Sequence, residues 1–456
     1  MTFGTLPDDV LLEIFNFYVD EANDVDAWHS LVHVCRKWRN VAFASPRRLN
    51  LQLRCTYRRS VRKMLDLWPE LPIAIAAPGD TIVEGAENVV AALEFNDRVS
   101  AICLGNVSGP VLVEVSAAVE QVPFPTLTDL LLWSYDGMAP VISDSFLGVS
   151  APRLQYLNLY GIPIPSLPKL LLSATDLGSI HVGNIPHSGY FSPEAMVTCL
   201  SALTRLEEIS LDFRSPLSRP SRAKPPLTRI ILPVLTYLRF KGVTEYLEGL
   251  LARIDTPLLD EINITLFNQL IFNTSQLPKF LCRTEQFKAL DQADVAFYER
   301  SIRVTLSPPA ETVPTKLMLS ILCSHFDWQL SSLAQVCNSS LPTLSTLERL
   351  NLGAYTNDPY FLPGQDDIDN TQWLELFHPF TNVKNLHLSE EVAPCIAPAL
   401  QGLSGEQVKE VLPALQDLFL DASQPSGPVQ EALREFISTR QLSGRPVAIH
   451  LWEKGK

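Results

Sequence analysis

The chain has 456 residues, a formal net charge of −14, 46% hydrophobic residues and 35 prolines. Its length corresponds to about three domains of ~150 residues each, with enough apolar material for a sizeable core. It contains no apolar run of the ~18–20 residues that a membrane helix needs, and its N-terminus lacks the basic-then-apolar pattern of a secretory signal. We therefore expect a protein of the cytoplasm, the nucleus or both, with no membrane partner.

Helical periodicity dominates the stretch from Leu6 to Arg39. Pro7 and the acids Asp8 and Asp9 favour the first turn of a helix, where proline costs little and acids face the positive end of the helix dipole. Apolar residues then recur at helical spacing in two runs: Val10, Leu11, Ile14, Phe15 and Tyr18, and, after an acidic loop, Trp28, Leu31, Val34, Cys35, Trp38 and Ala42. Two or three helices of this size bury little surface alone.

The order of these residues carries a family resemblance. The pattern L-P-x-x-V-L-L-x-I-F, followed after a gap by L-x-x-V-C-R-x-W-R-x-x-A, resembles an F-box over about residues 4–50. Tyr18 stands where that family usually has leucine, and the loop before Trp28 is a little long. The resemblance implies docking onto a Skp-family adaptor, and through it a cullin, by nine residues: Leu6, Pro7, Val10, Leu11, Ile14, Phe15, Val34, Cys35 and Trp38.

Two other interpretations concern the same region. The N-terminal helices could be a cap over a larger core. Residues 27–65 contain no acid, while residues 36–63 hold ten Lys or Arg. The chain after residue 65 has 26 basic against 43 acidic side chains. That acidic body disfavours nucleic acid as a partner. The basic segment fits a solvated face, steering towards an acidic adaptor, or a nuclear-localisation signal.

A short bridge follows. Ser45-Pro46 ends the second helical run, Leu49, Leu51 and Leu53 alternate as in an extended segment, and Tyr57–Trp68 has one apolar and one basic helical face. The local arrangement R-x-x-L-D-L-W-P-x-L-P-I resembles the junction of fungal F-box proteins. We therefore predict an F-box at residues 1–50, a helical bridge at 51–70 and a third region at 71–456.

The third region repeats a unit of the form apolar-x-x-apolar-x-apolar. The ten copies are Val99-Ile102-Leu104, Leu127-Leu130-Leu132, Leu154-Leu157-Leu159, Leu177-Ile180-Val182, Leu206-Ile209-Leu211, Leu235-Leu238-Phe240, Leu259-Ile262-Ile264, Leu347-Leu350-Leu352, Val383-Leu386-Leu388 and Leu415-Leu418-Leu420. The first seven begin 23 to 29 residues apart. Leucine-rich repeats have this spacing, because two apolar residues two apart face inward from one strand.

The predicted fold class is α/β: a small all-α F-box followed by an irregular leucine-rich-repeat solenoid, with a parallel concave sheet and helices on the convex side. Ile73/Ile75 and Ile449/Leu451 look like degenerate end copies. Between copies, segments beginning near Ser192 and Tyr246 are periodic like helices. The gap at about 266–346 predicts two degenerate repeats, with a strand at Ile302–Leu306 and a helix over Leu317–Val336.

Residues that flank the inward pair of each strand are expected on the concave face. Trp133, Tyr156 and Tyr160 form a predicted aromatic patch there, and aromatics and arginine dominate interface hot spots. The predicted substrate-binding residues are these three with Tyr237, Arg239 and Arg349; a covering loop or a neighbouring strand is the alternative role for any of them.

The chain lacks the common catalytic and nucleotide-binding motifs. Its eight cysteines are scattered without a C-x-x-C pair, and Cys323-Ser-His325 alone is a weak metal signal. We predict no catalytic residue, metal or cofactor. The predicted function is the substrate-recognition subunit of a Skp–cullin–F-box ubiquitin ligase, which holds an unknown protein substrate. The alternative is a leucine-rich-repeat scaffold outside any ligase.

Overall fold

The structure is a computed structural model that describes residues 6–22, 28–45, 49, 51–56, 61–77, 86–137, 139–216, 229–309, 315–355, 370–421 and 427–452. Its contacts divide the chain into two compact units. Unit 1 comprises Met1–Phe191 with Thr198–Leu206, and unit 2 comprises Ser192–Val197 with Glu207–Lys456. One boundary of this division, between Val197 and Thr198, falls within helix α8 (Pro193–Leu200). The domain boundaries predicted at residues 50 and 70 stay predictions.

Unit 1 begins with three helices, α1 (Asp8–Ala22), α2 (Trp28–Val34) and α3 (Arg36–Ala44). All three helices contribute buried apolar side chains to a shared core. These are Leu11, Leu12, Phe15, Trp28, Leu31, Val32, Val41 and Ala42. The helical periodicity of the first forty residues thus produces a closed bundle. The short helix α4 (Val61–Leu67) follows, and Tyr57 of the predicted bridge lies outside the described residues.

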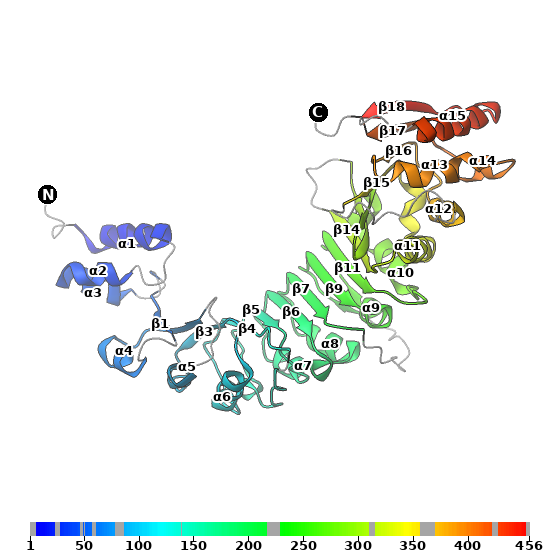
Figure 1. The fold of residues 1–456 in the computed structure, drawn as a ribbon. Coiled ribbons are helices and arrows are strands. Elements are labelled where there is room, and N and C mark those ends of the chain that lie inside the picture. The colour runs from blue at the N-terminus through cyan, green and yellow to red at the C-terminus, as the bar shows by residue number, and fades with distance from the viewer. Residues whose placement is uncertain are drawn as a thin grey trace. The chain divides into compact units, whose positions relative to one another are not determined.

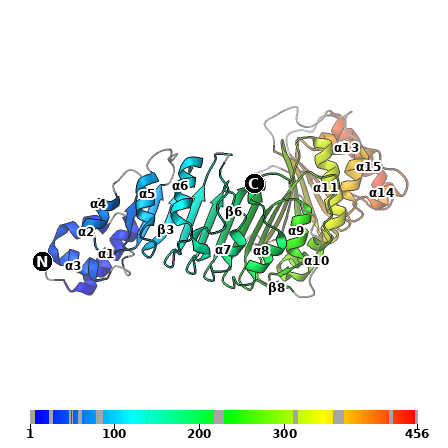
Figure 2. The ribbon, with the colours of Figure 1, turned by 90° about the horizontal axis from the view of Figure 1, so that it is seen from below.

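The rest of unit 1 is a parallel sheet with helices along one side (Figures 1 and 2). Its strands lie in chain order: β1 (Leu53–Cys55), β2 (Ile73–Ala77), β3 (Val99–Leu104), β4 (Asp129–Trp133), β5 (Tyr156–Tyr160) and β6 (Ser179–Ile185). The helical elements between them are α5 (Ala86–Leu93), α6 (Gly109–Val119), η2 (Leu147–Val149), α7 (Leu167–Leu171) and η3 (His187–Gly189). Strands and helical elements thus alternate along the chain, as the repeat spacing predicts.

Unit 2 has the same plan with longer outer elements. Its sheet has the order β7 (Glu208–Phe213), β9 (Tyr237–Gly242), β11 (Glu261–Phe267), β14 (Lys316–Leu322), β13 (Ser301–Ser307), β12 (Gln292–Tyr298), β15 (Arg349–Ala354), β16 (Asn385–Leu388), β17 (Asp417–Asp421) and β18 (Ala448–Trp452). A separate pair joins β8 (Ile230–Ile231) to β10 (Ile254–Asp255).

Helices again follow the strands of unit 2 in sequence and lie along one side of its sheet (Figure 2). They are α9 (Thr244–Leu251), α10 (Gln276–Arg283), η4 (Glu285–Ala289), α11 (Phe326–Ser340), η5 (Pro342–Thr346), α12 (Asn370–Phe377), α13 (Ala393–Gln401), α14 (Gln407–Glu410) and α15 (Gly427–Leu442). None of the helices within the described residues is long and apolar enough to cross a membrane.

Alternation along the strands explains where the core lies. In β4, Leu130 and Leu132 are buried while Asp129, Leu131 and Trp133 are partly exposed, and β9, β11, β16 and β17 show the same pattern. The apolar residues of every predicted repeat unit lie in or just before a strand, on the face that meets the helices. The fold is the predicted irregular leucine-rich-repeat type.

The region at 266–346 departs from the prediction. Its three strands form an up-and-down arrangement in which β13 is antiparallel to both β12 and β14, while β14 is parallel to β11 and β12 to β15. The predicted helix over Leu317–Val336 is wrong in its first part, because Leu317 belongs to β14 and α11 begins at Phe326. A run of buried apolar residues is compatible with either element, so periodicity alone misassigned it.

Candidate functional site

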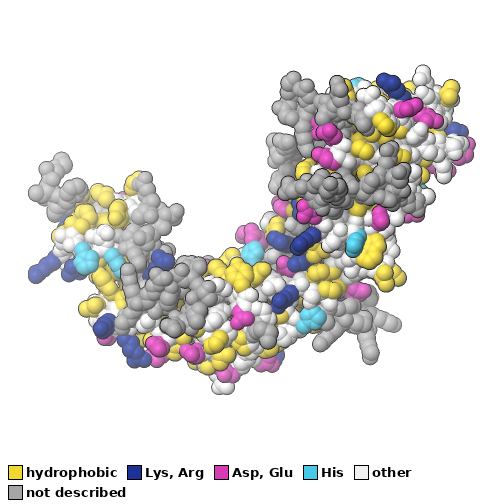
Figure 3. Space-filling model, viewed as in Figure 1, with side chains coloured by type: hydrophobic (Ala, Val, Ile, Leu, Met, Phe, Trp, Pro, Cys, Tyr) yellow, Lys and Arg dark blue, Asp and Glu magenta, His cyan; other side chains and the backbone are white. Residues whose placement is uncertain are grey.

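A row of exposed apolar side chains runs along α1. Val10, Ile14, Phe17 and Tyr18 are spaced to share one helix face, and their exposed fractions are 39%, 40%, 69% and 42%. Val34, at the end of α2, is 59% exposed. We call these five residues the F-box apolar surface. Figure 3 shows hydrophobic side chains gathered over α1. Leu6 is half-buried and Pro7 is exposed at the start of this helix.

Two of the predicted docking residues have a different role. Leu11 and Phe15 are fully buried, and the Phe15 ring packs on Trp38 of α3 with 4.9 Å between centroids. A side chain with no exposed surface cannot contact a partner while the bundle is folded. We therefore correct the prediction for Leu11 and Phe15: they form the core that supports the F-box apolar surface.

Cys35 and Lys37 hold the start of α3. Cys35 is the N-cap residue, and its Sγ accepts a hydrogen bond from the Trp38 backbone N–H at 3.5 Å. Lys37 Nζ donates to the Leu6 carbonyl at 2.6 Å and lies 3.6 Å from the Asp8 carboxylate. These contacts tie the α2–α3 turn, which carries Val34, to the first turn of α1. Trp38 is partly exposed.

A cluster of aromatic rings joins the bundle to the bridge. Trp28 is fully buried, its Nε1 donates to the Gln52 carbonyl at 3.1 Å, and its ring meets Trp68 edge-on at 5.2 Å. Trp68 also stacks on His29 at 5.1 Å and contacts Phe43 at 6.3 Å. Because Trp68 directly follows α4, these contacts pack α4 against α2 and α3.

The helix-free face of unit 1 carries the predicted aromatic patch. Trp133 of β4 lies opposite Tyr160 of β5, and Tyr156 lies opposite Asp129, so the predicted placement on adjacent strands is correct. Tyr135, which the sequence analysis missed, is 68% exposed and its ring lies 5.4 Å from that of Tyr160. Its signal was its position two residues beyond Trp133, just outside the strand.

Neighbouring residues fix how these rings lie. Tyr156 accepts a hydrogen bond from Asn158 Nδ2 at 3.3 Å, and its ring lies 5.7 Å from that of His181. The ring of Tyr160 lies across Gly183, where an added Cβ would sit 2.7 Å from Tyr160 Cδ2. A glycine at this position of β6 therefore lets the tyrosine ring lie flat on the sheet.

The other predicted substrate-binding residues belong to unit 2. Tyr237 and Arg239 share β9; burial raises the pKa of the Tyr237 hydroxyl, and a hydrogen bond from Arg239 acts in the opposite direction. Arg349 lies on β15, with β11, β14, β13 and β12 between it and β9. It donates to Gln292 Oε1 at 3.3 Å. The structure thus pairs Tyr237 with Arg239 and does not bring Arg349 to them.

The helix-free faces of β2 to β6 and of the strands of unit 2 differ in charge. At the open positions of β2 to β6 that the structure describes, Asp129 is the charged residue, and the others are Ala74, Ala76, Ala101, Cys103, Leu131, Trp133, Tyr156, Asn158, Tyr160, Ser179, His181 and Gly183. In unit 2 the same positions carry more charged residues, such as Lys241, which pairs with Asp212 at 2.9 Å, and Asp417, which contacts His450 Nε2 at 2.7 Å.

The His, Cys, Asp and Glu side chains of the described residues were compared with the requirements of a metal site. Among them no three His, Cys, Asp or Glu side chains lie close enough to hold a metal ion. The Cys323 thiol donates a hydrogen bond to the His325 carbonyl at 3.4 Å, which is a local side-chain-to-backbone contact. Burial raises the pKa of Cys55 and Cys395 to about 11, so these thiols stay protonated at neutral pH.

Comparison with known proteins agrees with the N-terminal geometry. Residues 3–49 match the family model described as F-box-like. The chain therefore combines an F-box-like domain with an α/β fold of leucine-rich-repeat type. Its resemblance to fungal F-box proteins stays a prediction.

Several solved structures are similar to this chain, and one of them is a leucine-rich-repeat protein. The leucine-rich repeat-containing protein LegL7 from Legionella pneumophila is 13% identical, with a TM-score of 0.27, over 84% of this chain and 97% of that chain. No curated protein matches this chain.

Proposed function

We propose that this protein is the substrate-recognition subunit of a Skp–cullin–F-box ubiquitin ligase. In this proposal the F-box apolar surface binds a Skp-family adaptor, which links the chain to a cullin. The helix-free face of the repeat fold holds a protein substrate. The chain itself performs no chemistry, because its contribution is to bring the substrate near the ubiquitin-transferring subunits. Such a protein would work in the cytoplasm or the nucleus.

The observation that carries the adaptor assignment is the exposure of five large apolar side chains on a bundle whose own core is already closed. Leu11, Phe15 and Trp28 fill that core with no exposed surface, so Ile14 and Phe17 are not needed inside it. Exposed apolar surface of this kind marks a protein interface. The match of residues 3–49 to the F-box-like family supports a Skp-family adaptor as the partner.

The first prediction tests this surface. Ile14→Asp should lower capture of a purified Skp-family adaptor at least about tenfold, because a charge would be buried at the interface. The measurement is a pull-down followed by titration calorimetry with the full chain. Val113→Asp is the matched control, since Val113 is 53% exposed on α6 and lies outside the F-box apolar surface. Adaptor binding by Ile14→Asp at the wild-type affinity contradicts the assignment.

The second prediction concerns the substrate face of unit 1. Its aromatic residues lie among small or uncharged neighbours, which favours an apolar substrate segment with polar flanks. Proximity labelling identifies proteins close to this chain, and those whose abundance rises on ligase inhibition are its candidate substrates. The double variant Trp133→Ala/Tyr160→Ala should reduce the number of these proteins several-fold. Tyr355→Ala is the control, because Tyr355 is 54% exposed in unit 2. An unchanged set in the double variant would remove this face from the proposal.

Two specific contacts favour the alternative of a scaffold outside any ligase. The Trp28–Trp68 packing and the Trp28–Gln52 hydrogen bond fasten the bundle to the following segment, as a structural cap would be. A cap, however, does not need an exposed apolar row on its outer helix. Deletion of the bundle separates the two interpretations.

A further inference from the structure

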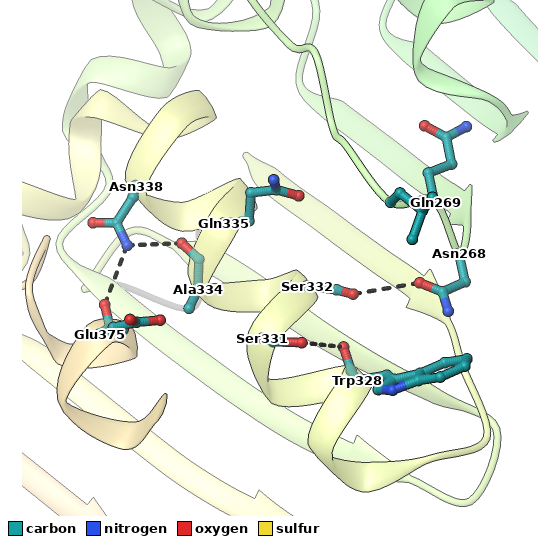
Figure 4. A pocket seen from close by; sticks show the side chains of 10 residues that line it. Asn268, Gln269, Trp328, Ser331, Ser332, Ala334, Gln335, Asn338 and Glu375 are labelled. Carbon is teal, nitrogen blue, oxygen red and sulfur yellow. Dashed lines mark hydrogen bonds between the residues drawn. The ribbon is translucent and has the colours of Figure 1, made fainter. Parts of the chain in front are cut away.

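A cavity of about 640 Å³ lies in unit 2, between α11, α12 and the segment after β11. Helix α11 contributes Trp328, Ser332, Gln335 and Asn338, whose spacing of three or four residues places them on one face. Figure 4 shows Ser332 and Gln335 projecting from this helix towards the segment of Asn268 and Gln269. The volume is within the range of small-ligand sites.

Hydrogen bonds fix the wall opposite α11. Ser332 Oγ donates to Asn268 Oδ1 at 3.3 Å, and the Phe272 backbone N–H donates to Gln335 Oε1 at 3.3 Å. The hydroxyls of Thr274 and Ser339 meet at 3.4 Å, and the Phe272 side chain is 4% exposed. The segment is thus anchored at three successive points along α11. A cavity formed before binding spares a ligand the cost of ordering it.

The lining leaves hydrogen-bonding groups of both kinds for a ligand. Gln269 and Gln335 each use Oε1 as an acceptor, from Thr244 and from the Phe272 N–H, and each keeps an amide NH₂ free of partners among the described residues. Asn338 Nδ2 donates to the Ala334 and Glu375 carbonyls, which leaves its Oδ1 as an acceptor. The exposed Glu375 carboxylate has no hydrogen-bond partner among the described residues.

An exposed indole completes the site. Trp328 is 58% exposed, and its ring meets His325 edge-on at 5.2 Å, so one face stays available. A large aromatic side chain normally finds more cover than this. At the rim, Leu270 is 99% exposed. Flat apolar surface thus stands beside amide and carboxylate groups.

We propose that this cavity binds a neutral carbohydrate chain. A sugar ring offers an apolar C–H face that stacks on an indole, and hydroxyls that both donate and accept at its edge. Glu375 is the one charged residue among the described lining residues, with no Lys, Arg or His, so a phosphate or another anion has no counter-charge there. A wholly apolar ligand would strip water from four polar side chains without replacing their hydrogen bonds.

A peptide fits the same lining less well. Peptides are commonly held by an exposed sheet edge, an apolar helix groove, an aromatic-lined groove or an arginine cluster. The described lining of this cavity has a single aromatic ring, no arginine and no strand edge. The amides of Gln269 and Gln335 favour a ligand with many hydroxyl groups over a peptide.

The experiment titrates the full chain with maltotriose, mannotriose and triacetylchitotriose, followed by calorimetry and tryptophan fluorescence. At least one trisaccharide should bind saturably and change the fluorescence. Trp328→Ala should weaken that binding at least about tenfold through loss of the stacking surface. Glu375→Leu should weaken it, and Glu375→Gln, which keeps an acceptor oxygen, should restore most of it.

Controls separate this site from a general loss of structure. Asp327→Asn changes the neighbouring residue of α11 outside the cavity and should bind as wild type. Circular dichroism and melting of each variant should match wild type, because Trp328 and Glu375 are exposed. Absence of saturable binding by all three sugars overturns the proposal, as does binding that Trp328→Ala leaves unchanged. Tighter binding of a capped neutral peptide, Gly-Asn-Ser-Gln-Gly, overturns it in favour of a peptide site.

Discussion

Neighbouring residues of α1 have opposite roles at the residue scale. Ile14 is 40% exposed and Phe15 is fully buried, although both are large, apolar and consecutive in the chain. A helix turns by about 100° per residue, so adjacent side chains point to different sides. The distinction between a docking residue and a core residue therefore depends on which side of α1 meets α2 and α3. Ile14→Asp tests the exposed side of this division.

The pH dependence of one partly buried carboxylate gives a third prediction. Glu248 of α9 accepts hydrogen bonds from the backbone N–H groups of Gln276 and Leu277, at 2.5 and 3.0 Å, and from Ser275 Oγ at 3.1 Å. It thereby caps the start of α10. Burial raises its pKa above the ordinary value of 4.5, and these hydrogen bonds act in the opposite direction.

The sign follows from the raised pKa. The folded chain holds the Glu248 proton more tightly than the unfolded chain, so this group's contribution to stability falls as pH rises from about 4.5 through the folded pKa. Glu248→Gln removes the titration. The free energy of unfolding of wild type relative to this variant should therefore be smaller at pH 7.5 than at pH 4.5, measured by urea denaturation. Glu245→Gln on the exposed side of α9 is the control, and a difference that grows with pH contradicts the prediction.

At the scale of elements, the aromatic cluster around Trp68 determines how the bundle is held. Rings from α2 and α3 surround this one side chain, including Trp28 at 5.2 Å and His29 at 5.1 Å.

The basic residues of this region do not all have the same role. Lys37 and Arg62 make ion pairs with Asp8 and Glu94, whereas Arg47, Arg48, Arg58 and Arg59 lie outside the described residues. Steering and localisation by the basic segment stay predictions.

The fourth prediction loosens this junction. Trp68→Ala should destabilise the packing of α2 and α3 on α4 by about 3 kcal/mol, because a large ring is removed from a partly buried cluster. Faster amide hydrogen exchange in α2 and α3, with little change in β3 to β6, is the expected result. Leu67→Ala serves as the control, since Leu67 is 79% exposed. Equal exchange in both variants would show that Trp68 does not hold the bundle.

The reversed strand of unit 2 is the second feature at this scale. A repeat fold of helix-linked parallel strands is interrupted where β12 turns directly into β13, with Phe297 paired to Ile302 and Tyr298 to Ser301. The link of Glu299 and Arg300 is too short for a crossover, so the strands must run antiparallel. The helix α11 then carries the chain from β14 to β15 across the hairpin.

At the scale of the whole molecule, the question is whether the N-terminal bundle serves the body or an external partner. The fifth prediction is that a chain lacking residues 1–50 stays soluble and keeps the circular dichroism of its repeat fold, but no longer binds a Skp-family adaptor. The reason is that the strands after residue 50 bury apolar side chains of their own, such as Ile102, Leu130 and Leu157. Size-exclusion chromatography and calorimetry provide the measurements. Aggregation of the shortened chain would instead favour the cap.

The sequence by itself determined the local pattern of this protein. Each repeat unit lies in or just before a strand, and Trp133 and Tyr160 lie side by side on adjacent strands, as their spacing predicts. These features were predictable because alternation along a strand is a local property. The F-box helices follow for the same reason, since the period of a helix is visible within a few turns.

The tertiary structure alone decided everything that depends on distant residues. Leu11 and Phe15 became core rather than surface because α2 and α3 pack on that side of α1. Strand β13 runs backwards because it pairs with β12 and β14, and the cavity beside Trp328 exists because the segment after β11 is bound along α11. Burial and pairing are relations between segments far apart in the chain, and periodicity within one segment does not encode them.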